Sequence, residues 1–229
     1  MTNRQSKLLK AIINQYIKTA EPISSEQLTK YFDFSSATIR HEMAELIKKG
    51  YLYQPHISAG RIPTEKAYQY YIENFLEEQE PKLEIKKIFR NIKRKKLNDF
   101  LVKLISKRIA ESIGQLTIFA FNRNSFYYTG LFYLFEQPEF RQIEIIYDVS
   151  QIIDHLDKIT SKLFDKIGQR TEIFLGQKNP FGEFYSTIFT RVYLPWEKDY
   201  SLFGLLGPMR MDYSQNLAVV NYIRESLSR

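Results

Sequence analysis

The chain has 229 residues, enough for two modest domains, and its 44% hydrophobic and 26% charged residues are ordinary values for a globular protein. It contains no cysteine, which excludes disulfides and thiolate metal sites. It also lacks an apolar run of about 18 residues, so no membrane-spanning helix is expected. The N-terminal segment has no signal-peptide core, and we therefore expect a cytoplasmic protein.

The net charge of +7 is distributed unevenly along the chain. Residues 1–81 carry ten basic and ten acidic side chains, and residues 109–229 carry twelve and fourteen. Residues 82–108 carry eleven basic and two acidic side chains. A basic excess indicates a polyanionic partner only where it is concentrated, so the charge draws attention to the middle of the chain.

Apolar residues at helical spacing, together with capping residues at each start, predict three helices near residues 3–19, 26–31 and 36–49. Tyr51–Tyr53 is typical of a short strand, 55–60 of a tight loop, and Arg61-Ile62 of a return strand. Thr64 then caps a fourth helix that continues to Leu76. Three helices followed by a hairpin predict a winged helix-turn-helix, with the loop as its wing.

The third predicted helix has the pattern of a recognition helix. One face is apolar, with Ile39, Met43, Leu46 and Ile47. The other face, near the N-terminus, has short hydroxyls and donors without an acidic residue: Ser36, Thr38, Arg40 and His41. Helix N-termini also present free N–H groups to phosphate. The start of this helix is therefore suited to the major groove of DNA.

We predict a DNA interface formed by this helix, the wing and the basic segment. Arg40 is suited to a bidentate contact with guanine, and Arg61 to a phosphate or the minor groove. The predicted contact residues are Ser35, Ser36, Thr38, Arg40, His41, His56, Ser58, Arg61, Lys93 and Arg94. His41 and His56 alone are a weak indication of a metal site, because no placed carboxylates accompany them. No metal or other cofactor is expected.

The basic segment reads as one long amphipathic helix, with Asn98 as the position where it would break. Its lysines and arginines flank an apolar stripe that must pack against the second domain or against a partner chain. The charged face either contacts phosphate through counterion release or is simply solvated. We assign residues 79–110 to this linking and dimerisation helix, after a DNA-binding domain over residues 1–78.

Residues 111–229 are predicted to form an α+β domain with an antiparallel sheet and helices to one side. Strands are expected at 116–121, 126–135, 172–175, 185–193 and 201–206. Residues 138–168 are expected to be mainly helical, and 214–227 to form a closing helix. Arg210-Met211-Asp212-Tyr213 follows a Gly-Pro turn and is interpreted as structural, with a ligand or partner site as the alternative.

Several motifs together resemble one family. They are Ser36-Ala37-Thr38-Ile39-Arg40, Gly50-Tyr51-Leu52, Gln54-Pro55-His56, Ser58-Ala59-Gly60-Arg61-Ile62-Pro63-Thr64, Gln137-Pro138-Glu139-Phe140, and Gly207-Pro208 with Arg210-Met211-Asp212-Tyr213. In this order they are similar to the HrcA family of heat-inducible transcription repressors. The resemblance implies a GAF-like C-terminal domain, a homodimer bound to an inverted repeat of double-stranded DNA, and support of repression by the chaperonin GroEL.

The sequence departs from the family pattern in two ways. It is much shorter, and the middle inserted domain and part of the GAF-like sheet have no counterpart. His41 also stands where the family usually has Asn, which bears on base preference.

Two alternative functions remain open. In one, the GAF-like domain of a winged-helix regulator senses a small molecule; in the other, the winged helix contacts a protein. No phosphate-binding or nucleophile motif is present, so we expect no enzymatic activity.

Overall fold

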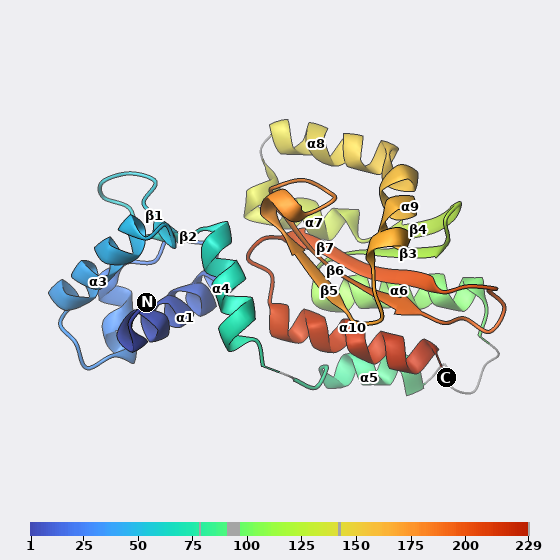
Figure 1. Ribbon diagram of the computed structural model, residues 1–229, viewed down its shortest axis with the longest axis horizontal. Coiled ribbons are helices and arrows are strands. Elements are labelled where there is room, and N and C mark those ends of the chain that lie inside the picture. The colour runs from blue at the N-terminus through green and yellow to red at the C-terminus, as the bar shows by residue number, and fades with distance from the viewer. Residues whose placement is uncertain (78, 91–96, 142, 229) are drawn as a thin grey trace. The chain divides into compact units, whose positions relative to one another are not determined.

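The computed structural model describes residues 1–77, 79–90, 97–141 and 143–228 (Figure 1). The chain divides into two compact units, Met1–Glu77 and Glu78–Arg229. In the described part of the chain, no helix is both long and apolar enough to cross a membrane.

The first unit contains four α-helices and a two-stranded antiparallel sheet in its described residues. In chain order these are α1 (Asn3–Thr19), α2 (Ser25–Leu28), the 3-10 helix η1 (Thr29–Tyr31), α3 (Ser36–Lys48), β1 (Leu52–Tyr53), β2 (Ile62–Pro63) and α4 (Glu65–Phe75) (Figure 1). Capping residues stand at the helix starts as expected: Thr64 accepts a backbone hydrogen bond at the start of α4, and Thr2 and Ser35 do so at the starts of α1 and α3. Gly50 follows α3 in the left-handed conformation that ends a helix, with φ 76°.

The core of this unit is built from the apolar faces of α1 and α3. Leu9, Ile12 and Ile13 are fully buried on α1, and Met43 and Leu46 on α3. Thr64 ties the hairpin to this core, because its hydroxyl donates to the carbonyls of Gly50 and Tyr51 at 2.7 and 3.1 Å. Burial of apolar surface contributes about 25 cal/mol per Å², so the position of α3 is set mainly by its inner face.

The second unit is an α+β domain with a five-stranded antiparallel sheet of order β4-β3-β7-β6-β5. Its elements are α5 (Leu83–Arg90), α6 (Asp99–Ile113), β3 (Leu116–Asn122), β4 (Ser125–Thr129), α7 (Leu131–Glu136), η2 (Pro138–Arg141), α8 (Ile143–Asp154), α9 (Leu156–Lys166), β5 (Glu172–Leu175), η3 (Gly176–Lys178), β6 (Tyr185–Val192), β7 (Ser201–Pro208) and α10 (Tyr213–Leu227). This architecture is consistent with a GAF-like domain.

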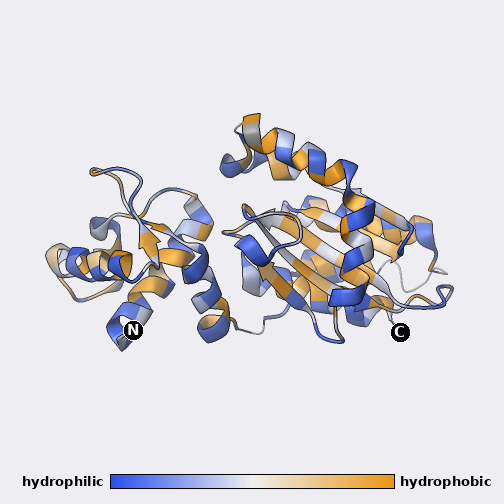
Figure 2. Ribbon diagram, turned by 45° about the horizontal axis from the view of Figure 1, so that its top comes forward, coloured by the Kyte–Doolittle hydropathy of each residue, from blue (hydrophilic) through white to orange (hydrophobic). Residues whose placement is uncertain are grey.

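Helices cover both faces of this sheet, so the expectation of helices on one side was wrong. α6 and α10 pack on one face, and α7, α8 and α9 cover the other, as Figure 1 shows. The reason lies in the strands, because the described residues of β7 are buried throughout and do not alternate between buried and exposed. In Figure 2 the helices alternate between hydrophobic and hydrophilic colours, as expected of helices with one buried face.

The basic segment forms two helices in its described residues, α5 and α6, and the second begins after Asn98, the position where a break was expected. Asn98 has extended backbone and its side chain accepts a bond from Leu101 N at 3.0 Å, so it starts a new helix. The apolar stripe of α6, including Ile105 and Ile109, is buried inside this unit. The second domain itself, and not a partner chain, therefore covers these residues.

The strand predicted to continue to residue 135 ends instead at Thr129. Gly130 has a φ of 93°, and a Cβ there would lie 2.6 Å from the carbonyl oxygen of Gln115. A side chain would be strained at this φ and would also collide with the neighbouring backbone. The chain turns at this glycine into α7, and the aromatic run that follows packs as a helix.

Candidate nucleic-acid interface

The start of α3 is held by its own hydroxyl side chains. Ser35 caps the helix, accepting from Thr38 N at 3.2 Å, and its Oγ lies 3.0 Å from the Thr38 hydroxyl. Ser36 is half-buried and its Oγ lies 3.0 Å from that of Ser25 on α2. These bonds orient α3 against α2, so Ser36 has a structural contact that the sequence did not indicate.

Arg40 and His41 lie on the exposed side of α3. Within the residues that the structure describes, the guanidinium of Arg40 has neither a hydrogen bond nor an ion pair, so its donors face solvent. No acidic residue lies in the first turn. The nearby carboxylate of Glu42 is directed toward α1, where it accepts from Gln5 Nε2 at 3.0 Å and from Arg4 at 3.4 Å.

The other acidic residue on this helix is also engaged. Glu45 accepts from Lys48 Nζ at 2.7 Å, and this hydrogen bond and the charge of Lys48 lower the pKa of the Glu45 carboxyl. The exposed end of α3 therefore presents cationic and polar groups to a ligand, with its carboxylates bound elsewhere. An anionic surface such as a DNA backbone meets little repulsion there.

The loop between β1 and β2 is braced by a residue that the sequence analysis did not single out. Gln54 Nε2 donates to the carbonyls of Ile57 and Ala59 at 2.7 and 3.0 Å. His56 Nδ1 lies 3.1 Å from Ser58 Oγ, and Ala59 N donates to His56 O at 2.9 Å. The loop is thus a hydrogen-bonded turn of fixed shape. The motif Gln54-Pro55-His56 includes Gln54, but its role as the brace of the loop is seen only in the structure.

Arg61 leaves this loop and joins a third segment of chain. Its backbone forms a bridge with Ile23, with N–O distances of 2.8 and 2.9 Å. Its half-buried side chain approaches Ala59 O at 3.5 Å, and its Nε is buried with no hydrogen-bond partner among the described residues. One donor of the guanidinium is therefore left unpaired at a buried position.

Gly60 explains why this bridge requires a glycine next to it. A Cβ at Gly60 would lie 2.5 Å from both the carbonyl carbon and the oxygen of Pro22, and 2.6 Å from the carbonyl carbon of Ile23. Real side chains do not approach backbone so closely, so a glycine is required for the loop to meet the 22–23 segment. The Ala-Gly-Arg part of the wing motif thus has a steric reason.

The structure describes only two of the four remaining predicted DNA-contact residues. His56 and Ser58 are exposed on the loop and paired with each other. Lys93 and Arg94 lie outside the described residues. The structure accordingly brings residues 35–41 and 56–61 into one unit.

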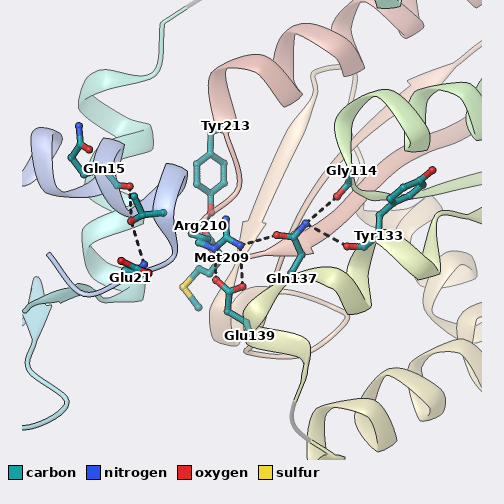
Figure 3. A network of polar contacts seen from close by, with 10 residues as sticks. Gln15, Glu21, Gly114, Tyr133, Gln137, Glu139, Met209, Arg210 and Tyr213 are labelled. Atoms are coloured by element: carbon teal, nitrogen blue, oxygen red, sulfur yellow. Dashed lines mark hydrogen bonds and ion pairs between the residues drawn. The ribbon is translucent and has the colours of Figure 1, made fainter. Parts of the chain in front are cut away.

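A second polar cluster lies in the second unit and joins two of the sequence motifs. Arg210 Nε donates to Glu139 Oε1 at 2.5 Å, and its Nη2 donates to Gln137 Oε1 at 2.7 Å (Figure 3). Gln137 Nε2 in turn donates to the carbonyls of Gly114 and Tyr133, both at 3.4 Å. The Arg210 side chain is only 12% exposed, and Glu139 28%. This cluster fixes η2 to the end of β7, a structural role as interpreted for Arg210.

Comparisons with known proteins match this chain to one family. The family model described as "HrcA protein C terminal domain" matches residues 2–217. The heat-inducible transcription repressor HrcA of Brevibacillus brevis is 26% identical over 334 aligned residues, covering 100% of this chain and 97% of its own length. That of Natranaerobius thermophilus is 55% identical over 75 residues, covering 32% and 22% of the two chains.

The chain therefore belongs to the HrcA family, which confirms the resemblance read from the motifs. The alignment to the Brevibacillus brevis protein spans 334 residues, whereas this chain has 229, so many aligned positions have no counterpart here. A crystal structure of a hypothetical protein is similar in fold, with a TM-score of 0.75 and 19% identity over 100% of this chain and 96% of that one.

Proposed function

We propose that this protein represses transcription of heat-shock genes by binding duplex DNA through its first unit. The observation that carries the proposal is the exposed side of α3, where Arg40 and His41 face solvent and the neighbouring carboxylates are engaged. Family membership supports it, since the relatives are named heat-inducible transcription repressors. Such a protein would act in the cytoplasm, where the DNA lies.

In this proposal the first unit is a winged helix, with α3 in the major groove and residues 54–61 as the wing. Ser35, Thr38, Arg40 and His41 contact the duplex from the helix; His56, Ser58 and Arg61 contact it from the wing. A cap hydroxyl at a helix start is well placed for phosphate, and an arginine with open donors for a guanine edge. Ser36 contributes by orienting α3, because its hydroxyl is already close to that of Ser25.

We further propose that the units correspond to a DNA-binding domain and a GAF-like regulatory and dimerisation domain. In a homodimer, the two DNA-binding domains would bind an inverted repeat whose half-sites are separated by whole helical turns of DNA, roughly 34 Å or a multiple. Family resemblance also motivates GroEL as a partner that supports repression. The basic residues at 93 and 94 would then add phosphate contacts that carry no sequence information.

The test is a selection of bound duplexes from a random pool with the full chain, followed by mobility shift on the selected duplex. Arg40→Ala should lower specific affinity by about 1–3 kcal/mol and relax the preference at one base pair. Lys18→Ala, on α1, is a matched control that removes an exposed cation away from α3. If selection returns no common sequence, or Arg40→Ala binds like the wild type, the assignment of α3 is wrong.

One observation favours a second candidate, the regulator whose GAF-like domain senses a small molecule. An open surface pocket of about 340 Å³ lies in the second unit, and the residues that line it are Gln169, Arg191, Tyr193, Arg224, Glu225 and Ser228. Arg191 is held by a bond to Ile167 O at 2.8 Å and by the ring of Tyr200, 3.9 Å from its guanidinium carbon. A library of small carboxylates and phosphates screened by thermal shift separates the two: a ligand that changes duplex affinity, and fails on Arg191→Ala, favours the sensor.

A further inference from the structure

The tip of the wing carries an apolar side chain that the fold does not use. Ile57 is 99% exposed, the highest value among the exposed large hydrophobic residues of the described chain. The turns of proteins favour Gly, Pro, Asn, Asp and Ser, whereas a β-branched residue such as isoleucine favours strands. Local structure therefore gives no reason for isoleucine at this position.

The surrounding loop holds Ile57 outward in a fixed position. Its two neighbours are joined beneath it by the contact of 3.1 Å between His56 Nδ1 and Ser58 Oγ. Its carbonyl accepts from Gln54 Nε2, and the turn is closed by the bond from Ala59 N to His56 O. At the base of the loop, the Ile23–Arg61 bridge anchors the returning chain. Because the turn is already held in place, an apolar group on it loses little further conformational freedom when it binds.

A single exposed apolar residue is common on protein surfaces and needs no explanation by itself. Here the setting supplies one, since Ile57 lies at the tip of the β1–β2 loop, four residues from the cationic side chain of Arg61, in the same unit as α3. The walls of the minor groove of DNA are formed by deoxyribose rings, which are largely apolar. Many proteins that bind this groove place an apolar side chain such as isoleucine, leucine or phenylalanine between its base steps.

We propose that Ile57 packs into the minor groove as an apolar contact, beside the duplex surface read by α3. The proposal rests on the proposed DNA-binding function and adds to it a residue that contributes without charge. Arg61 would supply the electrostatic part of the same contact. Removing the outer carbons of Ile57 should weaken binding about tenfold, equivalent to about 1.4 kcal/mol.

The distinguishing measurement is the dependence of affinity on salt. Each phosphate contact contributes to the slope of log affinity against log salt concentration, whereas an apolar contact does not. We would measure fluorescence anisotropy of the full chain on the selected duplex at several salt concentrations. Ile57→Ala and Ile57→Ser should lose about tenfold at every salt concentration with an unchanged slope, and Ile57→Leu should retain affinity. Arg61→Ala, the matched control, should reduce the slope.

The groove is tested with netropsin, which occupies the minor groove. It should weaken the wild type and Ile57→Leu, and should affect Ile57→Ala much less. Because Ile57 is fully exposed, thermal unfolding of these variants should match that of the wild type, which excludes misfolding as the cause.

The outcomes separate the two proposals. Equal affinity of Ile57→Ala and the wild type on a duplex that Arg40→Ala binds more weakly would overturn the role of Ile57 alone. Loss of affinity that netropsin does not affect in any variant would also overturn it, since the contact would lie outside the minor groove. Failure of the wild type to select any duplex would instead overturn the proposed function.

Discussion

Replacing Gly60 by alanine should destabilise the first unit by opening the bridge between Ile23 and Arg61. The added Cβ would lie 2.5 Å from the Pro22 carbonyl group, so the two segments must separate. Two backbone hydrogen bonds of 2.8 and 2.9 Å are then lost, at about 1 kcal/mol each. The lower entropy of the unfolded alanine chain returns about 0.4–1 kcal/mol. With the penalty for groups left unpaired, we expect a net loss of about 2 kcal/mol.

Amide hydrogen exchange measures this locally, which suits a chain of two units. The amides of Ile23 and Arg61 should exchange roughly 30-fold faster in Gly60→Ala, the factor that corresponds to about 2 kcal/mol. Gly50→Ala is the matched control, because its cost comes from a φ of 76° and its Cβ would meet no atom closer than 4.0 Å. It should cost about 1 kcal/mol and leave the bridge protected. Unchanged exchange at Ile23 and Arg61 in Gly60→Ala would refute the steric argument.

Three further predictions concern other contacts. Arg210→Ala should lower the free energy of unfolding by about 2–3 kcal/mol because it leaves the partly buried carboxylate of Glu139 unpaired. The loss should be smaller in a Glu139→Gln background. Denaturant melts of the wild type, the two single variants and the double variant measure this, and additive effects would show that the pair does not interact. The pKa of the Asp165 carboxyl is lowered by its hydrogen bonds with Arg123 and should rise to its ordinary value in Arg123→Gln, as followed by NMR titration. Because this pKa is lowered, its stabilisation is present above the ordinary pKa of aspartate and is lost as pH falls through the lowered value; an identical titration in both chains would contradict the pairing. Gln54→Ala should release two loop carbonyls and weaken duplex binding several-fold without lowering the melting temperature, whereas Gln69→Ala, at an exposed position of α4, should leave binding unchanged.

The parts of the fold that sequence predicted well are those set by local chemistry. Thr2, Ser35 and Thr64 were recognisable as caps because a short hydroxyl side chain directly precedes a run of helical periodicity. Strands β5 and β6 were recognisable from their β-branched and aromatic residues. In the same way, Arg40 could be placed on the outer face of its helix from spacing alone.

The errors arose where distant segments decide the outcome. The aromatic run after Gly130 has strand-like composition, but the backbone near Gln115 forces a turn there. The second layer of helices, by contrast, had a local signal that was misinterpreted: the run of β7 does not alternate between apolar and polar residues, and such a run indicates a strand that is buried on both faces. At the candidate site, the bracing by Gln54 and the clash avoided by Gly60 depend on atoms of other residues, and no periodicity encodes them.

The strand order of the second unit has a consequence for synthesis of the chain. β3 lies in the sheet between β4 and β7, and the carbonyl of its residue Phe121 is bonded by Ser201, 80 positions later. At about 5–20 residues per second, β7 is synthesised on the order of 10 s after β3. During that time the edge of β3 that pairs with β7 has no partner strand. An unpaired apolar strand edge is prone to aggregate. We expect each new copy to pass through an interval of exposed apolar surface before its sheet can close, and that interval would lengthen whenever translation slows.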